Sequence, residues 1–182
     1  MSEIFAKSGG YRSLKCYRKT EIIYDATLIF CERFLQKSDR TYDQMVQAAR
    51  SGKQNIAEGN LAAATSTKSE LFLTNIARAS LGELLEDYKD YLRNGEFELW
   101  GIEDERVVYV RGMGRQKDEC FEHYREIIRT RSADTVANIM ICLIHQAMYL
   151  LKRLLESMEE RFLREGGINE RMYAARVKSR GR

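Results

Sequence analysis

The chain has 182 residues and no proline, whereas average usage would give about nine. Because proline interrupts helix interiors, its absence permits long helices without proving them. Charged residues make up 31% of the chain and aromatic residues 10%, which excludes disordered and low-complexity classes. The apolar run at 139–144 is far shorter than the roughly 20 residues that a membrane-spanning helix needs.

The N-terminal residues lack the apolar core of a signal peptide. We therefore expect a cytoplasmic protein of one domain with a short appendage and no membrane association. Four cysteines in such a chain are expected to be free thiols rather than a disulfide framework. They are Cys16, Cys31, Cys120 and Cys142.

The charge is unevenly distributed, although the net charge is only +3. Residues 161–182 hold seven of the 30 basic residues and two of the 27 acidic ones, a balance of +5. The other 160 residues hold 23 basic and 25 acidic side chains, a balance of −2. We predict a bundle domain at 1–163 and a basic C-terminal suffix at 164–182.

Four long segments have helical periodicity: 14–36, 42–58, 68–93 and 135–163. The spacing of Thr41 to Gln44 and of Thr67 to Glu70 predicts capping boxes at the second and third helices. Glycines predict the helix stops, at Gly59, Gly95 and Gly166. In the second helix the small residues Ala48, Ala49 and Gly52 predict close approach by another backbone.

The fourth helix keeps an apolar a/d-like repeat across three heptads, the pattern of a bundle seam. We predict an all-α fold, an antiparallel up-down-up-down four-helix bundle with an extra short helical region between the third and fourth helices. In that region, 107–110 fits a short strand or a buried helical turn, and 116–131 fits a shorter helix. Residues 168–177 fit one or two further helical turns.

Three strings in the first half of the chain carry a family resemblance. They are ARSGKQNIAEG at 49–59, TSTKSE at 65–70 and ARASLGEL at 77–84. They resemble the bacterial four-helix-bundle family that includes proteins encoded in intervening sequences of large-subunit ribosomal RNA and the accessory protein of diversity-generating retroelements. The string FLREGGINER at 162–171 resembles the variant with a C-terminal suffix.

The resemblance implies a fold and partners rather than a catalytic activity. The retroelement accessory proteins are similar to pentameric, basic-surfaced barrels that bind nucleic acid and a reverse transcriptase. The resemblance therefore implies a homo-oligomer, a pentamer by analogy, with RNA or DNA and a protein as possible partners. The positions that match the family string and carry polar or special residues are Arg50, Ser51, Asn55, Glu58 and Gly59.

Ser51, Asn55 and Glu58 lie at i, i+4 and i+7, on one edge of the second helix. They fit either a ligand or partner contact, or a polar network that fixes the packing of the bundle. On the third helix, an apolar patch with Phe72 and Ile76 leads into an acidic stripe with Glu83 and Asp87. These four are interface candidates, with a solvated helix face as the alternative.

Two Cys-x-x-His pairs, Cys120 with His123 and Cys142 with His145, raise the alternative of a zinc site and a metal-dependent enzyme. Their spacing does not match a standard finger, and no Glu-x-x-His motif of a di-metal bundle occurs in the sequence. No nucleophile has a base partner in its sequence context. We therefore predict no catalytic residues, no metal, no cofactor and no enzymatic activity.

The basic suffix is the strongest functional feature of the sequence, because its side chains can neutralise phosphates and so bind nucleic acid in a salt-dependent way. The alternatives are a solubilising terminus or a strap across a neighbouring subunit. The predicted function is nucleic-acid binding or scaffolding by a non-enzymatic oligomer, and the alternative is a purely structural assembly module. The predicted nucleic-acid-binding residues are Arg161, Arg164, Arg171, Arg176, Lys178, Arg180 and Arg182.

Overall fold

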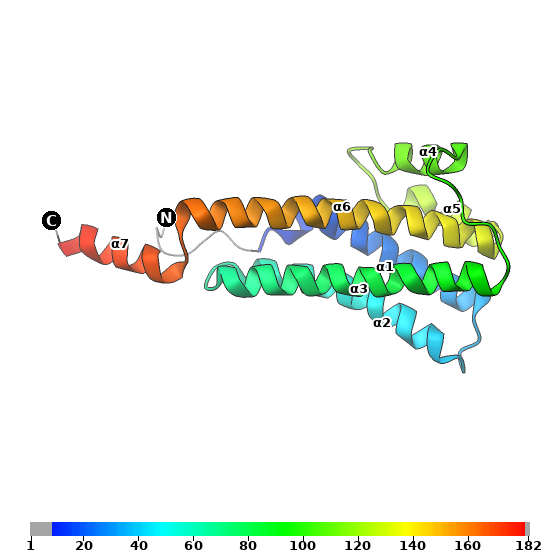
Figure 1. Ribbon diagram of the computed structural model, residues 1–182, viewed down its shortest axis with the longest axis horizontal. Helices are drawn as coiled ribbons and strands as arrows, with labels where there is room; N and C mark the ends of the chain where they lie inside the picture. The colour runs from blue at the N-terminus through cyan, green and yellow to red at the C-terminus, as the bar shows by residue number, and fades with distance from the viewer. Residues whose placement is uncertain (1–8, 181–182) are drawn as a thin grey trace.

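A computed structural model describes residues 9–180, and these residues contain helices and no strand. The all-α prediction is therefore confirmed. Four long helices dominate the molecule (Figure 1). They are α1 (Lys15–Phe34), α2 (Arg40–Ala62), α3 (Thr67–Asn94) and α6 (Ala133–Glu165). A 3-10 turn (Tyr11–Ser13) precedes α1.

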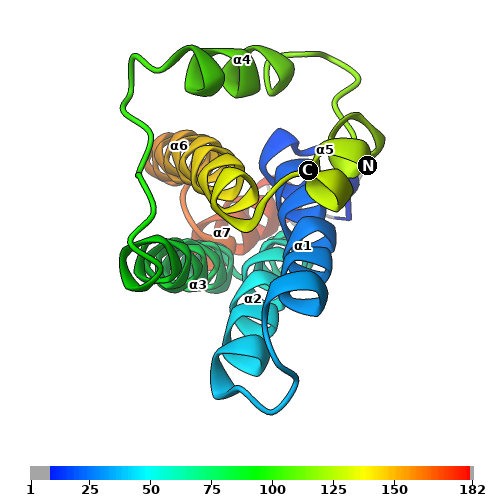
Figure 2. The same cartoon turned by 90° about the vertical axis from the view of Figure 1, so that its right-hand side faces the viewer.

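The four long helices surround one hydrophobic core, which Figure 2 shows end-on. Helix α1 packs on α2 and α6, and α3 packs on the same two helices. Fully buried side chains such as Phe30, Leu81 and Leu143 fill the centre. The Tyr88 ring packs edge-on against Phe30, with 4.9 Å between the ring centroids. Its hydroxyl donates a hydrogen bond to Thr27 Oγ1 (3.1 Å), which satisfies the one polar atom of that buried ring.

Helices α2 and α3 approach each other closely through small residues. Ala48, Ala49 and Gly52 are all buried. A Cβ atom on Gly52 would lie 2.9 Å from Leu81 Cδ2 and 3.7 Å from the Ala77 carbonyl oxygen. The predicted close approach by another backbone is confirmed, and the partner is α3.

The two predicted capping boxes are wrong. Helix α2 begins earlier, and its N-cap is Asp39, whose side chain accepts from the Thr41 amide (2.8 Å). At α3 the N-cap is Ser66, whose hydroxyl accepts from the Ser69 amide (3.1 Å). In both cases a capping residue lies upstream of the predicted one, so the threonine belongs to the first turn.

Gly59 is a packing residue and not a helix stop, which corrects a second prediction. Helix α2 continues to Ala62, and Gly59 is buried inside it. A Cβ atom at Gly59 would lie 3.2 Å from the Glu70 carbonyl oxygen of α3. The glycines at the other two predicted stops do end helices: Gly95 is the C-cap of α3, and Gly166 is the C-cap of α6 with φ of 69°.

Two short helices lie between α3 and α6, as predicted in outline. The valine-rich segment is helical, in α4 (Glu105–Met113), and it packs on α6. The second is α5 (Glu122–Thr130), which begins later than predicted and packs on α1. Figure 2 shows α4 spanning the space above α6, joined at both ends by long connections.

The suffix forms its own helix, α7 (Ile168–Arg180), which has no buried residue. It extends beyond the end of the four long helices in Figure 1. The predicted helical turns at 168–177 are therefore confirmed. By length and composition, one window within residues 133–180 could cross a membrane. About 61% of that window is buried against the rest of the protein, which is also typical of a core helix.

The α2–α3 contact yields a test with a matched control. Gly82 lies inside α3 with open space where a Cβ would stand. Gly82→Ala should raise the free energy of unfolding by about 0.5–1 kcal/mol, because alanine is the better helix former. Gly52→Ala gains the same propensity but collides with the fully buried Leu81, so we expect a net loss of about 1 kcal/mol. Urea unfolding monitored by circular dichroism measures both changes, and equal changes would contradict the close packing.

Candidate anion-binding site

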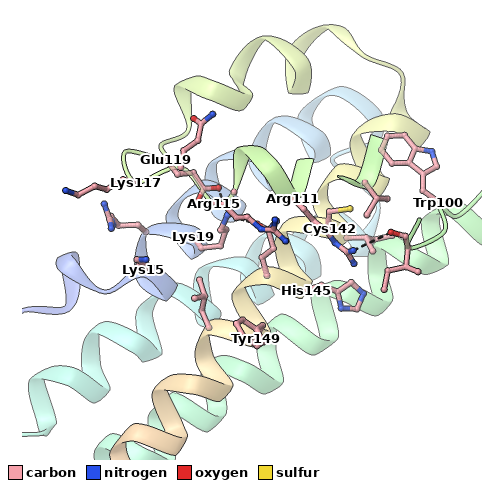
Figure 3. A pocket seen from close by; sticks show the side chains of 18 of the residues that line it. Lys15, Lys19, Trp100, Arg111, Arg115, Lys117, Glu119, Cys142, His145 and Tyr149 are labelled. Carbon is pink, nitrogen blue, oxygen red and sulfur yellow. Dashed lines mark hydrogen bonds and ion pairs between the residues drawn. The ribbon is translucent and has the colours of Figure 1, made fainter. Parts of the chain in front are cut away.

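A cleft of about 850 Å³ lies between α1, α6 and the segment 99–119 that includes α4 (Figure 3). Its volume is in the range of sites for small organic ligands. Its lining combines positive charge with apolar and aromatic side chains. We call it the α4 cleft.

The α4 cleft is strongly basic, because seven lysine and arginine residues line it against one acidic residue, Glu119. Three of the seven are neighbours on α1 at i, i+3 and i+4, so the helical repeat brings them to one face. The others come from α3, α4 and the connection after α4. The seven are Lys15, Arg18, Lys19, Lys89, Arg111, Arg115 and Lys117.

A buried ion pair forms one wall of the cleft. Lys19 is 1% exposed, and its ammonium forms an ion pair and hydrogen bond with Glu119. The same ammonium donates to Gln146 Oε1 of α6 (2.7 Å). The Tyr124 hydroxyl of α5 donates to Glu119 Oε1 (2.6 Å). This network joins α1, α5, α6 and the connection between α4 and α5 at one point.

Burial has electrostatic consequences for this network. Desolvation lowers the pKa of Lys19, and the neighbouring Glu119 carboxylate opposes this by favouring the charged ammonium. Burial also raises the pKa of Tyr124, and its hydrogen bond to Glu119 raises it further. Glu119 is therefore the one anion that compensates the buried Lys19 charge, and the remaining cations of the cleft lack such a partner among the lining residues.

The two connections that flank α4 are held to α6 by specific contacts. Gly114 lies so close to Gln146 that a Cβ atom would stand 2.1 Å from its Oε1. On the other side, the buried Asn138 accepts from the Trp100 amide (2.9 Å) and donates to the Glu98 carbonyl oxygen (2.9 Å). Asn138 thereby satisfies two backbone groups that have no helical partner, and it fixes the connection before α4 to α6.

The other end of the cleft is apolar and contains Trp100, the single tryptophan. The Arg106 guanidinium lies 4.3 Å from the centre of the Trp100 ring and pairs with Asp104 (2.6 Å). Trp100 is buried, whereas the Tyr149 ring is exposed at the cleft. The aliphatic side chains of this part of the lining are Leu99, Ile102, Val107, Ile141 and Leu150.

His145 and Cys142 lie between the two ends (Figure 3). Burial, Lys89 and Arg111 lower the pKa of His145, which favours a neutral ring at pH 7. Burial raises the pKa of the Cys142 thiol to about 11, so it is a poor nucleophile. No group of three or more His, Cys, Asp or Glu side chains that could hold a metal occurs in residues 9–180. The two Cys-x-x-His pairs thus do not come together as one zinc site.

The residues of the family string lie away from the α4 cleft, at the α2–α3 contact. The Ser51 hydroxyl lies 2.9 Å from the Ser80 hydroxyl of α3. Asn55 Nδ2 donates to Ser51 Oγ (3.0 Å) and to the Ser51 carbonyl oxygen (2.9 Å). Arg50 and Glu58 are exposed. Of the two interpretations, these contacts favour a packing network for Ser51 and Asn55.

The four interface candidates are accessible on α3. Phe72 is 64% exposed, Ile76 is half-buried and Glu83 is exposed. Asp87 is half-buried, and burial together with Asp90 and Glu83 raises its pKa. The exposed Phe72 and the neighbouring carboxylates of α3 form a surface that suits a partner with positive charge.

The predicted nucleic-acid residues differ in how available they are. Arg161 forms an ion pair and hydrogen bond with Glu70, which is 3% exposed on α3. Burial raises the pKa of Glu70, and Arg161 opposes that shift. The charge of Arg161 thus compensates an internal carboxylate. Its assignment as a phosphate contact stays a prediction, and binding a phosphate there would require Arg161 to leave Glu70 buried without a counter-charge.

The other members of the set lie at the end of α6 and on α7. Arg164 pairs with its neighbour Glu165 (2.9 Å). Arg171 is half-buried, and its Nε and Nη2 atoms are buried without a hydrogen-bond partner in the described part of the chain. Arg176 and Arg180 line a shallow groove on α7 with the exposed Tyr173. Lys178 is exposed, and Arg182 lies outside the described residues.

The α4 cleft has no clear signature in the sequence, and the reason is topological. Its charges are spread over residues 15–117, within a body whose balance is −2, so no local run of basic residues marks them. The only local signal is the cluster Lys15, Arg18 and Lys19 on one face of a helix. Comparison of the chain with models of known families, with curated proteins and with solved structures gives no match.

The buried ion pair yields a pH-dependent prediction. Glu119→Gln keeps the shape of the side chain but removes the anion beside Lys19, so the free energy of unfolding at pH 7 should fall by about 3 kcal/mol. Burial then lowers the pKa of Lys19 in the folded chain still further. Between that value and the unfolded value near 10.4, the unfolded chain binds the extra proton, so stability rises with pH.

Urea unfolding of the Glu119→Gln variant at pH 7, 8, 9 and 10 should therefore show the deficit shrinking at high pH. The control is Glu122→Gln, because Glu122 is exposed and pairs within α5 with Arg125 (2.5 Å). It should change stability by less than about 0.5 kcal/mol at every pH. A deficit that is the same at all pH values would contradict an uncompensated Lys19 charge.

Proposed function

We propose that this protein is a non-enzymatic binding protein for nucleic acid, RNA or DNA, and that the α4 cleft is its principal contact. The observation that carries the proposal is the excess of seven lysine and arginine residues over one carboxylate around one cleft. Phosphates that neutralise such side chains release condensed counterions, which drives binding. The exposed Tyr149 adds an aromatic surface on which a base can stack.

Helix α7 is proposed as a second contact for the same ligand. It carries Arg176 and Arg180 on an exposed surface together with Tyr173, which is 73% exposed. The mixture of cations and an accessible aromatic ring suits a single strand better than a flat protein surface. The resemblance of residues 49–59 to the intervening-sequence and retroelement family favours the same class of ligand, and membership of that family remains a proposal.

We further propose that the four long helices form the antiparallel up-down-up-down bundle that serves as the rigid scaffold for both contacts. The packing of α1 on α2 and α6, and of α3 on the same two helices, supports this arrangement. The order of colours along the ribbons in Figure 1 supports it as well. A cytoplasmic location would suit such a protein and is part of the proposal.

The decisive experiment compares two double variants of equal net charge. Arg115→Glu with Lys117→Glu reverses two cations of the α4 cleft. Lys152→Glu with Arg153→Glu reverses two exposed cations on α6 that do not line it. We expect the first to weaken binding to single-stranded RNA or DNA more than tenfold and to reduce the slope of log K against log salt by about 1.4.

Fluorescence anisotropy over a salt titration measures these quantities on the full chain, and a chain that ends at Gly166 serves as the arm lacking α7. The control variant should retain nearly all of the wild-type slope. Equal effects of the two double variants would place binding outside the α4 cleft. Negligible binding by the wild-type chain at low salt would remove the proposal altogether.

The second candidate is an assembly module, and the exposed apolar residue at the start of the acidic stripe on α3 favours it. Large exposed apolar side chains beside acidic ones are common at contacts between subunits. We expect light scattering at micromolar concentration to give a mass well above 21.2 kDa. Phe72→Glu should shift the mass toward the monomer while circular dichroism stays unchanged, because Phe72 is 64% exposed. A monomeric wild-type chain would contradict an obligate assembly such as a pentamer.

A further inference from the structure

The α4 cleft is chemically polarised along its length, and this limits what can fill it. Figure 3 shows Lys15, Lys117 and Arg115 at one end and Trp100 at the other, with Cys142 and His145 between them. A ligand that fits both ends must therefore carry negative charge at one end and an apolar or planar group at the other. A uniform polyanion would leave the apolar end unfilled, and a hydrocarbon chain would leave the cations unpaired.

The basic end has more donors than acceptors. The carboxylate of Glu119 is already engaged by Lys19 and by the Tyr124 hydroxyl. The side chains of Lys15, Arg115 and Lys117 line this end and form no ion pair or hydrogen bond within residues 9–180. A phosphate group, with several acceptor oxygens and up to two negative charges, supplies both the acceptors and the charge.

The apolar end carries polar side chains at its inner border, which favours a heterocyclic ring over an aliphatic chain. Arg111 and the ring of His145 line the cleft beside Cys142 and Ile141. Burial and neighbouring cations lower the pKa of His145, so the neutral ring offers one donor and one acceptor. The Tyr149 ring, 64% exposed, is available for stacking. A base with hydrogen-bonding edges can satisfy these groups.

Trp100 lies at the apolar end of the cleft. Trp100 is buried, and the backbone of Glu98 and Trp100 is held to α6 by Asn138. A volume of about 850 Å³ accommodates one nucleotide-sized ligand with bound water. A site of this size suits a terminal nucleotide better than an internal one, because an internal nucleotide needs an exit for the strand on both sides.

We propose that the α4 cleft binds one phosphorylated nucleoside unit, with its base between Tyr149 and the Trp100 end and its phosphate against Arg18 and Arg115. The unit is either a free nucleotide or the terminal nucleotide of a strand. The second source rests on the proposed nucleic-acid function. It turns the protein from a general binder of single strands into one that recognises phosphorylated ends.

The test compares strands of one sequence and differing ends. The full chain is titrated with a linear single strand that has a 5′-phosphate, with one that has a 3′-phosphate, with one that has neither and with a covalently closed circle. We expect one phosphorylated linear strand to bind at least tenfold more tightly than the circle and the unphosphorylated strand. Equal binding by the circle would overturn end recognition while leaving the proposed function in place.

Free nucleoside monophosphates and triphosphates, titrated by calorimetry, form the second arm. Binding of a free nucleotide without binding of any strand supports the cleft assignment and removes the nucleic-acid function. Absence of binding by every strand and every free nucleotide overturns both.

A matched pair of tyrosine variants locates the site. Tyr149→Ala removes an aromatic ring that lines the cleft, and Tyr109→Ala removes an equally exposed ring, 63%, that does not line it. Both positions are exposed, so both variants should fold, which circular dichroism verifies. We expect Tyr149→Ala to weaken nucleotide or strand-end binding about tenfold. Tyr109→Ala should leave binding within twofold, and equal losses in the two variants would overturn the placement of the base.

Discussion

The ammonium group of Lys19 is the point on which the arrangement around the cleft depends. It is buried, and a buried cation is tolerated only where an anion and hydrogen-bond acceptors reach it. Glu119 and Gln146 do so from two different segments. Satisfying one charge therefore fixes the connection between α4 and α5 against α1 and α6. The four long helices would pack through their apolar faces without this pair, but the connection between α4 and α5 would have no polar anchor there.

The same logic separates two kinds of cation in this protein. Lys19 and Arg161 each compensate a largely buried carboxylate, Glu119 and Glu70 respectively, and so contribute to the architecture. Among the residues that line the α4 cleft the cations have one acidic neighbour, Glu119, which pairs with Lys19, and Lys89 pairs with Glu86 outside the lining. A surface with uncompensated positive charge has a field that attracts anions, and the walls of a cleft concentrate that field. Counting charges along the chain cannot make this distinction, because it depends on which carboxylates are buried.

The sequence predicted the helices well and their ends poorly. Long apolar repeats identified all four core helices, because burial on a helix face imposes a period that survives in the chain. The start of a helix depends on one hydrogen bond between a capping side chain and a backbone amide. Asp39 and Ser66, which lie upstream of the predicted threonines, make these bonds instead. Gly59 matched the pattern of a helix stop, but it is buried against α3. The need for a small residue there comes from the neighbouring helix, so the local sequence does not show it. The α4 cleft contains contacts between residues about 100 positions apart, such as Lys19 and Glu119. No local sequence pattern predicts such contacts.

Helix α4 is short and is attached to the remainder of the protein through little buried surface. It packs on α6, and its buried side chains are Val107 and Val110 alone among its nine residues. Segments with so few buried contacts open locally at a free energy below that of global unfolding. We therefore expect α4 to form a separate, weaker cooperative unit than the long helices. This wall of the cleft would then open by local fluctuation while the hydrophobic core of the four helices stays intact.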